Sequence, residues 1–162
     1  MPDHDARLSV VFVCTGNICR SPMAAAVFTE HLRRAGLADR VRVSSAGTGS
    51  WHVGEPADPR AVATLKEHGY PITHTAAQVG AEHLSADLLV ALDSGHLRSL
   101  RRMTDDHTKV RLLRSFDPDA GENADVPDPY YGDDEGFTEV LDMIERTCSA
   151  LVPHIERVLS PS

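Results

Sequence analysis

Short apolar runs alternate with longer amphipathic stretches along this chain of 162 residues, and the alternation predicts an α/β protein. Apolar or alternating runs of strand length occupy residues 8–13, 41–45, 86–92 and 109–113. Apolar residues recur at helical spacing over residues 22–35, 59–68, 95–103 and 137–159. Gly36 and Gly69 are expected to end the first two helices, and Pro153 is expected to kink the last one.

This order of elements predicts a parallel sheet with its ligand at one edge. Strands that alternate with helices form βαβ units with right-handed connections, and such units build a mostly parallel sheet. Ligands of these sheets sit beyond the carboxyl ends of the strands. The end of the first strand, at Cys14, is therefore a favoured position for a functional site.

The residues that follow the first strand form the clearest chemical motif in the chain. They read Cys14-Thr15-Gly16-Asn17-Ile18-Cys19-Arg20-Ser21 and lead into the helical stretch that begins at Pro22. A tight loop at a helix N-terminus points several backbone N–H groups at one place, where the helix dipole also favours an anion. We therefore expect these residues to form a phosphate-binding loop.

Side chains of this loop supply the chemistry needed to attack a phosphoryl group. The positive field of the loop favours the Cys14 thiolate, which is the reactive form of a thiol. Arg20 can grip two phosphate oxygens through its planar guanidinium. Ser21 can donate to the sulfur and help it leave in a second step. Asn17 suits a left-handed backbone conformation, and Gly16 lets the loop turn tightly.

Phosphoryl transfer to a thiolate also needs an acid that protonates the leaving oxygen. Asp128 is the candidate, because it lies in the stiffened segment Val126-Pro127-Asp128-Pro129-Tyr130-Tyr131-Gly132. It would then act as a base on the water that hydrolyses the cysteinyl phosphate. On composition alone, however, an ordinary surface turn is the better explanation of this segment.

Composition narrows the class of protein. The formal net charge of −8 disfavours a nucleic-acid partner, which needs a basic footprint. No apolar run is long enough to span a bilayer, so no membrane partner is expected, and residues 1–7 do not read as a signal peptide. Three cysteines without an export signal favour the cytoplasm, although secretion by another route stays open. We expect one domain over residues 1–162, with mobile ends at 1–7 and 160–162.

Taken together, the motifs resemble those of the low-molecular-weight protein tyrosine phosphatase family, in its actinobacterial form. The resemblance rests on the run from Cys14 to Met23, on Ser45-Ala46-Gly47-Thr48, on Gly49-Ser50-Trp51-His52 and on Asp128-Pro129-Tyr130-Tyr131-Gly132. It implies a flavodoxin-like three-layer αβα fold with a four-stranded parallel sheet. It also implies hydrolysis of phosphotyrosine and aryl phosphates through a cysteinyl phosphate, without a metal or organic cofactor.

The resemblance also implies a role for individual residues. Cys14 would be the nucleophile, Arg20 the binder of the phosphate and transition state, and Asp128 the acid and then the base. Asn17, Ser21, Ser45 and His74 match a hydrogen-bond network that shapes the phosphate-binding loop of the family. The substrate pocket would be lined by Trp51, His52, Tyr130 and Tyr131, and its aromatic walls would suit the ring of phosphotyrosine.

The remaining cysteines have less certain roles. Cys19 can form a disulfide with Cys14 that shields the nucleophile from over-oxidation. It can equally be a small side chain that packs the loop, which is common for a free cysteine, and both interpretations stay open. Cys148 lies on an apolar stretch of the last helix and is assigned to the core.

Other activities on this fold are alternatives. Arsenate reductase would need further redox cysteines around the third strand, and residues 80–100 contain none. Protein-arginine phosphatases resemble this loop but carry threonine at the position of Ile18, so Ile18 with the tyrosine pair favours phosphotyrosine. A non-catalytic phosphate-binding module would need neither the Cys14 thiol nor the Asp128 acid.

The expected partners follow from this interpretation. They are phosphotyrosine-containing proteins as substrates, inorganic phosphate as product, and a tyrosine kinase that acts on Tyr130 or Tyr131. A monomer is the default state.

Overall fold

A parallel sheet forms the centre of the computed structural model, which describes residues 8–70, 72–117, 125–129 and 134–159. Its strands are β1 (Leu8–Cys14), β2 (Val41–Gly47), β3 (Leu88–Ala91) and β4 (Val110–Leu112). They lie in the order β2-β1-β3-β4, and each neighbouring pair is parallel. The predicted four-stranded parallel sheet is therefore confirmed. The chain ends at 1–7 and 160–162, which were expected to be mobile, lie outside the described residues.

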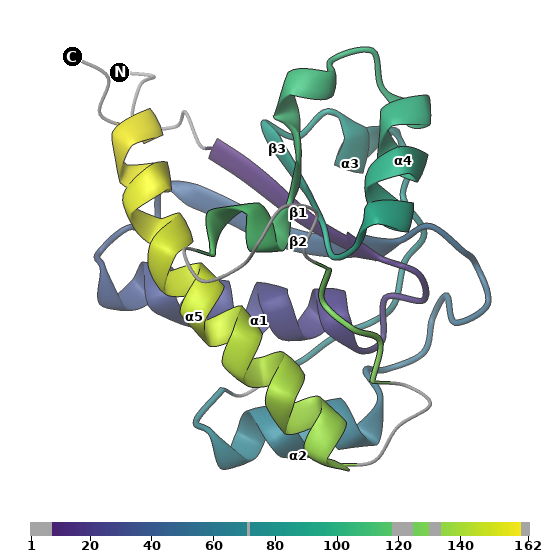
Figure 1. The fold of residues 1–162 in the computed structure, drawn as a ribbon, viewed down its shortest axis with the longest axis vertical. Helices are drawn as coiled ribbons and strands as arrows, with labels where there is room; N and C mark the ends of the chain where they lie inside the picture. Colours follow the sequence, from purple (N-terminus) through teal and green to yellow (C-terminus); the bar gives the residue numbers. More distant parts are fainter. Residues whose placement is uncertain (1–7, 71, 118–124, 130–133, 160–162) are drawn as a thin grey trace.

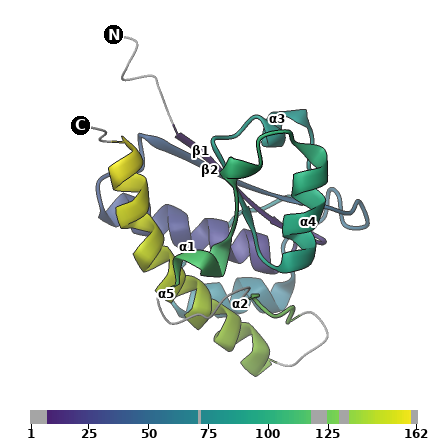
Figure 2. The same ribbon diagram turned by 45° about the horizontal axis from the view of Figure 1, so that its top comes forward.

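Helices cover both faces of the sheet (Figures 1 and 2). On one face lie α1 (Arg20–Arg34), α5 (Asp134–Leu159) and, beside them, α2 (Pro59–Glu67). On the other lie α3 (Ala81–Leu84) and α4 (Ser94–Met103). This is the three-layer arrangement that the resemblance implied.

The alternation of side chains along β1 builds two hydrophobic cores. Val10 and Phe12 belong to the larger core, which includes residues of α1, α2 and α5. Val11 and Val13 belong to the smaller core, which includes Leu100 of α4. Because both faces of β1 are buried, its sequence is a nearly continuous apolar run, as is usual in parallel sheets.

Several element boundaries differ from those expected, above all beside the phosphate-binding loop. α1 begins at Arg20 instead of residue 22, so that Arg20 and Ser21 belong to its first turn. β2 continues to Gly47 instead of stopping at residue 45, because Ala46 and Gly47 pair with Val13 and Cys14. Both shifts extend regular structure up to the loop.

Smaller differences occur in the second half of the chain. α2 ends at Glu67, β3 is limited to residues 88–91, and β4 to residues 110–112. The sequence pattern did not predict α3 or the short 3-10 helices η2 (His107–Lys109) and η3 (Leu113–Phe116), because they lack a long apolar period. α5 starts three residues earlier than expected, at Asp134, and contains Pro153.

Carboxylates cap the helices that approach the loop. Asp58 precedes Pro59 and accepts a hydrogen bond from the Arg60 amide at 2.9 Å, which starts α2. Asp93 accepts from the His96 amide at 3.0 Å and starts α4. In the described part of the chain, none of the helices combines the length and apolar character needed to cross a membrane.

Candidate active site

The loop that follows β1 is held against the end of β2. The Thr48 amide donates to the Cys14 carbonyl at 2.9 Å, and the Gly49 amide donates to the Thr15 carbonyl at 3.0 Å. A side chain at Gly47 would bring its Cβ to 2.7 Å from the Thr15 carbonyl oxygen. The absence of a side chain at Gly47 therefore allows β2 to approach the loop closely.

Asn17 lies at the centre of a buried hydrogen-bond network. Its backbone has φ = 58°, the left-handed conformation expected from the sequence, and its side chain is fully buried. Its Nδ2 donates to Ser21 Oγ and to Ser45 Oγ, both at 2.9 Å, and its Oδ1 accepts from the Ala77 amide at 2.9 Å. These contacts fix the loop from inside the protein.

His74 also contacts Asn17. Its Nε2 lies 2.6 Å from the Asn17 carbonyl, to which it donates. Burial lowers the pKa of His74 and outweighs the opposite effect of this hydrogen bond. The structure thus brings together the four residues that the resemblance grouped, namely Asn17, Ser21, Ser45 and His74.

The Cys14 thiol ends β1 and faces a hydroxyl. Its Sγ lies 2.9 Å from Ser21 Oγ in the first turn of α1. Because Asn17 Nδ2 already donates to this hydroxyl, the proton of Ser21 can be directed at the sulfur. This geometry suits stabilisation of a Cys14 thiolate.

Arg20 is a buried cation held by two oxygen acceptors. Its Nη1 donates to Asp93 Oδ2 and to the Val126 carbonyl, both at 2.9 Å, while Nη2 lies 3.7 Å from Asp128 Oδ2. Burial alone would raise the pKa of Asp93, but the hydrogen bonds from Arg20 and from the His96 amide keep this pKa below its usual range. The guanidinium is thereby fixed before any ligand binds.

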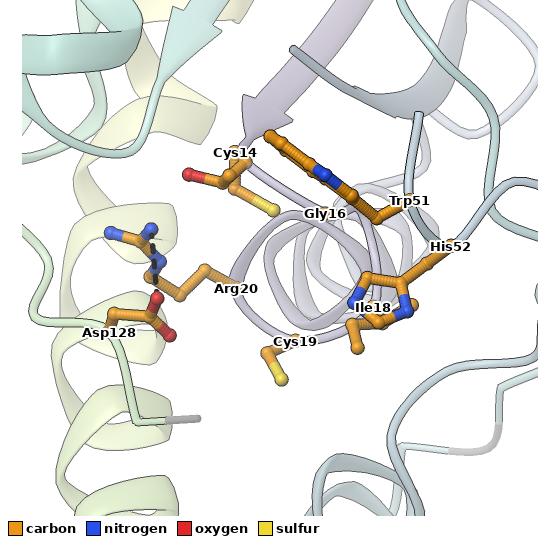
Figure 3. Close-up of a pocket in the computed structure, with 9 residues that line it drawn as sticks. Cys14, Gly16, Ile18, Cys19, Arg20, Trp51, His52 and Asp128 are labelled. Carbon is orange, nitrogen blue, oxygen red and sulfur yellow. Dashed lines mark ion pairs between the residues drawn. The ribbon is translucent and has the colours of Figure 1, made fainter. Parts of the chain in front are cut away.

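Cys14, Arg20 and Asp128 meet in a cavity of about 430 Å³ (Figure 3). It is lined by Cys14, Thr15, Gly16, Ile18, Cys19, Arg20, Trp51, His52 and Asp128. The Asp128 side chain is 41% exposed and lies across the cavity from the loop. Among the described residues, no three His, Cys, Asp or Glu side chains are grouped as metal ligands.

Trp51 and His52 form the rim of this cavity. Trp51 is 73% exposed, and its ring packs on Gly49, where a Cβ would collide with it. His52 packs on Gly16 in the same way, since a Cβ on that glycine would lie 2.8 Å from the His52 ring. Nδ1 of His52 lies 3.1 Å from Glu55 Oε1. Tyr130 and Tyr131, the other expected pocket residues, lie outside the described residues.

All three cysteines carry free thiols and are buried. Burial, with Asp58 and Cys14 nearby, raises the pKa of Cys19. Cys148 is fully buried in α5, as expected for a core residue, and burial raises its pKa as well. The disulfide between Cys14 and Cys19 and the packing role of Cys19 both stay as predictions.

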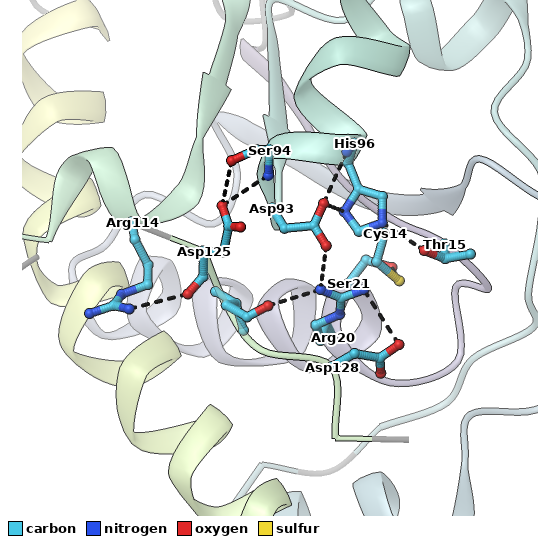
Figure 4. Close-up of polar contacts among 11 residues, drawn as sticks. Cys14, Thr15, Arg20, Ser21, Asp93, Ser94, His96, Arg114, Asp125 and Asp128 are labelled. Atoms are coloured by element: carbon cyan, nitrogen blue, oxygen red, sulfur yellow. Dashed lines mark hydrogen bonds and ion pairs between the residues drawn. The ribbon is translucent and has the colours of Figure 1, made fainter. Parts of the chain in front are cut away.

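The segment after β3 contributes contacts that were not predicted from the sequence. Asp93 binds Arg20, and His96 Nε2 lies 2.8 Å from Thr15 Oγ1 (Figure 4). Ser94 donates from its amide and hydroxyl to Asp125 Oδ1, at 2.9 and 2.7 Å. Their position could have indicated a role at the site, because these polar residues follow a buried strand at the edge where ligands of parallel sheets bind.

A thiol, a fixed arginine and a facing carboxylate that line one cavity are the groups that a cysteine-dependent phosphatase needs. Residues 9–160 match the family model of the low molecular weight phosphotyrosine protein phosphatases. The chain belongs to this family, as the resemblance indicated.

Individual relatives agree with this assignment. A protein of Mycobacterium tuberculosis named low molecular weight protein-tyrosine phosphatase A is 57% identical over 154 residues, which cover 94% of each chain. The solved protein tyrosine phosphatase of Entamoeba histolytica has a TM-score of 0.89 and 32% identity, covering 93% of this chain and 98% of that one. The solved drosophila arginine phosphatase has a TM-score of 0.84 and 31% identity, covering 94% of this chain and 99% of that one.

Proposed function

We propose that this chain is a protein tyrosine phosphatase that works through a cysteinyl phosphate. The observation that carries the proposal is the meeting of Cys14, Arg20 and Asp128 in one cavity of about 430 Å³. The names of the relatives support the same activity.

In the first step, the Cys14 thiolate attacks the phosphorus of the substrate. An S–P bond forms while the bond from phosphorus to the tyrosine oxygen breaks, and protonated Asp128 gives its proton to that oxygen. Nη1 of Arg20 already donates to Asp93 and to the Val126 carbonyl. The remaining N–H groups of the guanidinium therefore bind the oxygens of the transferring phosphoryl group. Phenolic tyrosine leaves as a neutral group.

In the second step, water hydrolyses the cysteinyl phosphate. The Asp128 carboxylate takes a proton from the water, whose oxygen attacks phosphorus while the S–P bond breaks. The products are inorganic phosphate, protonated Asp128 and the Cys14 thiolate. Ser21, at 2.9 Å from Sγ, stabilises the thiolate as it leaves.

Phosphoarginine is the second candidate substrate, because an arginine phosphatase is among the structural relatives. Ile18 lines the cavity of this chain. An aliphatic side chain offers no hydrogen bond to a guanidinium, and Trp51 at the rim suits an aromatic ring. Both features favour phosphotyrosine.

Further properties are proposed with this function. The substrates are phosphotyrosine-containing proteins, and a tyrosine kinase acting on Tyr130 or Tyr131 would add charge beside the Asp128 loop. The enzyme acts as a monomer in the cytoplasm, where a reduced Cys14 is maintained. Burial of Cys148 in α5 supports setting arsenate reductase aside.

The test compares hydrolysis of p-nitrophenyl phosphate by the wild type, Cys14→Ser and Asp128→Ala, with chelator present. We expect activity in the wild type, none in Cys14→Ser, and a loss of about a hundredfold or more in kcat for Asp128→Ala. Glu139→Ala, which removes an exposed carboxylate of α5, is the matched control and should retain full activity.

Phosphotyrosine and phosphoarginine peptides of the same sequence decide the substrate. Preferential cleavage of phosphotyrosine supports the proposal. Preferential cleavage of phosphoarginine would leave the nucleophile in place but contradict the interpretation of Ile18. Activity of Cys14→Ser equal to the wild type would overturn the mechanism.

A further inference from the structure

His96 is a buried histidine beside the phosphate-binding loop that the steps above do not use. It lies in the first turn of α4 and is 4% exposed. Its Nε2 is 2.8 Å from Thr15 Oγ1, the hydroxyl of the residue that follows the nucleophile. This contact ties the start of the loop to a helix that is distant in sequence.

Asp93 connects His96 to Arg20 (Figure 4). Its Oδ2 accepts from Arg20 Nη1 at 2.9 Å, and its Oδ1 accepts from the His96 amide at 3.0 Å. The same Oδ1 lies 3.1 Å from His96 Nδ1. The two atoms are close enough for an ion pair, but their orientation does not meet the criteria for a hydrogen bond. Among the described residues, Nδ1 has no hydrogen-bond partner.

The surroundings of His96 determine its charge and its tautomer. Burial lowers its pKa to about 4, with a further lowering by Arg20, against the opposite effects of Asp93, Asp128 and Asp125. The imidazole is therefore neutral at pH 7 and carries one proton. A lone pair on Nδ1 would face the Asp93 carboxylate, so the proton belongs on Nδ1, and Nε2 is left as an acceptor.

We propose that His96 is a positioning residue, which in its Nδ1–H tautomer accepts a hydrogen bond from the Thr15 hydroxyl and so holds the loop beside Cys14. Fixing Thr15 fixes the backbone direction at the start of the loop. The inference rests on the proposed function, because its main consequence is in turnover.

Two substitutions of His96 separate this role from simple packing. The amide of glutamine reaches the position of Nε2, whereas that of asparagine reaches only the position of Nδ1. We expect His96→Asn to lower kcat for p-nitrophenyl phosphate about tenfold with KM changed less than about twofold, the pattern of a lost transition-state contact. His96→Gln should recover most of this loss.

Substitutions of Thr15 test the other end of the contact. Thr15→Val should resemble His96→Asn, Thr15→Ser should resemble the wild type, and the double variant His96→Asn with Thr15→Val should be no slower than either single variant. His107→Asn, which replaces an exposed histidine of η2, is the control and should keep the wild-type kcat. If His96→Asn does not fold, the two Thr15 variants decide.

A tautomer measurement provides a readout that does not depend on turnover. Long-range ¹⁵N–¹H correlation spectra at pH 7 should show His96 protonated at Nδ1 and unprotonated at Nε2. The opposite tautomer would overturn the inference, as would wild-type kcat in His96→Asn or equal losses in His96→Gln and His96→Asn. If the wild type hydrolyses nothing, the proposed function fails, and the tautomer alone decides the positioning role.

Discussion

At the scale of single residues, Ser21 connects the nucleophile to the network that shapes the loop. Its Oγ lies 2.9 Å from Cys14 Sγ and accepts from Asn17 Nδ2 at 2.9 Å. Because the amide of Asn17 can only donate at this nitrogen, the hydroxyl proton of Ser21 does not point at Asn17 and can point at the sulfur. The buried network therefore leaves this proton available for a hydrogen bond to a Cys14 thiolate.

Removal of this hydroxyl should slow the second step. We expect Ser21→Ala to lower kcat about ten- to a hundredfold, the range for a lost hydrogen bond to a charged atom. Because the thiolate then leaves more slowly, a burst of p-nitrophenol should appear in rapid-mixing experiments. Ser149→Ala, which removes an exposed hydroxyl from α5, should leave kcat unchanged. Unchanged kcat in Ser21→Ala would contradict the role of Ser21.

Asn17 combines a demanding backbone conformation with several buried contacts. We expect Asn17→Ala to lower the free energy of unfolding by about 2–4 kcal/mol, because it removes the network and because alanine tolerates φ = 58° less well than asparagine does. Asn17→Gly also removes the network but avoids the strain, so it should be about 1 kcal/mol more stable than Asn17→Ala. Urea unfolding measures both values. If Asn17→Ala were more stable than Asn17→Gly, residue 17 would not keep its left-handed backbone conformation in the alanine variant.

At the scale of elements, carboxylate caps place two helices at the loop. Asp93 starts α4 and also binds Arg20, while Asp58 starts α2 and donates its amide to the Ile18 carbonyl at 2.8 Å. Each cap thus performs a local task in its helix and a long-range task at the loop. Helix initiation and site geometry are coupled for this reason.

The cap of α2 predicts a stability difference that depends on pH. Burial would raise the pKa of Asp58, but hydrogen bonds from Arg60 outweigh it and leave this pKa below its usual range. The ionised cap therefore stabilises the fold above the unfolded pKa of about 3.9, and this stability is lost as pH falls through the lower folded value. Asp58→Ala should cost about 1 kcal/mol at pH 7.

Urea unfolding between pH 7 and pH 3 checks this prediction. The difference between wild type and Asp58→Ala should be constant down to about pH 5 and shrink below about pH 4. Asp58→Asn, which keeps a cap acceptor but cannot ionise, should lose less stability at pH 7. If wild type and Asp58→Ala differed in free energy of unfolding by the same amount at pH 3 as at pH 7, the charge of Asp58 would have no role in the cap.

At the scale of the whole molecule, the sequence predicted what depends on local pattern and missed what depends on tertiary contacts. The apolar run of β1 and the Cys14 to Ser21 motif are visible in the sequence, because strand, loop and helix are contiguous. Asp93 and His96 are not, since nothing in their own neighbourhood shows that they will meet Arg20 and Thr15. The extra residues of β2 depend on pairing with the end of β1, which is also invisible locally.

The two cores of the molecule should differ in how they affect activity. Ile144 of α5 is fully buried in the larger core, and Leu100 of α4 is fully buried in the smaller one. Replacing either with alanine should lower the free energy of unfolding by about 2–5 kcal/mol. Asp93 and His96, at the start of α4, contact Arg20 and Thr15, so we expect Leu100→Ala to disturb these contacts more than Ile144→Ala does.

Turnover of the two variants, measured below their unfolding transitions, separates these effects. We expect Leu100→Ala to lower kcat about three- to tenfold, because a looser α4 no longer fixes Asp93 and His96 against the loop. Ile144→Ala should keep the wild-type kcat despite a similar loss of stability. Equal kcat in the two variants would mean that the smaller core supports only the sheet. The predicted difference would mean that the smaller core also holds the phosphate-binding loop in its active geometry.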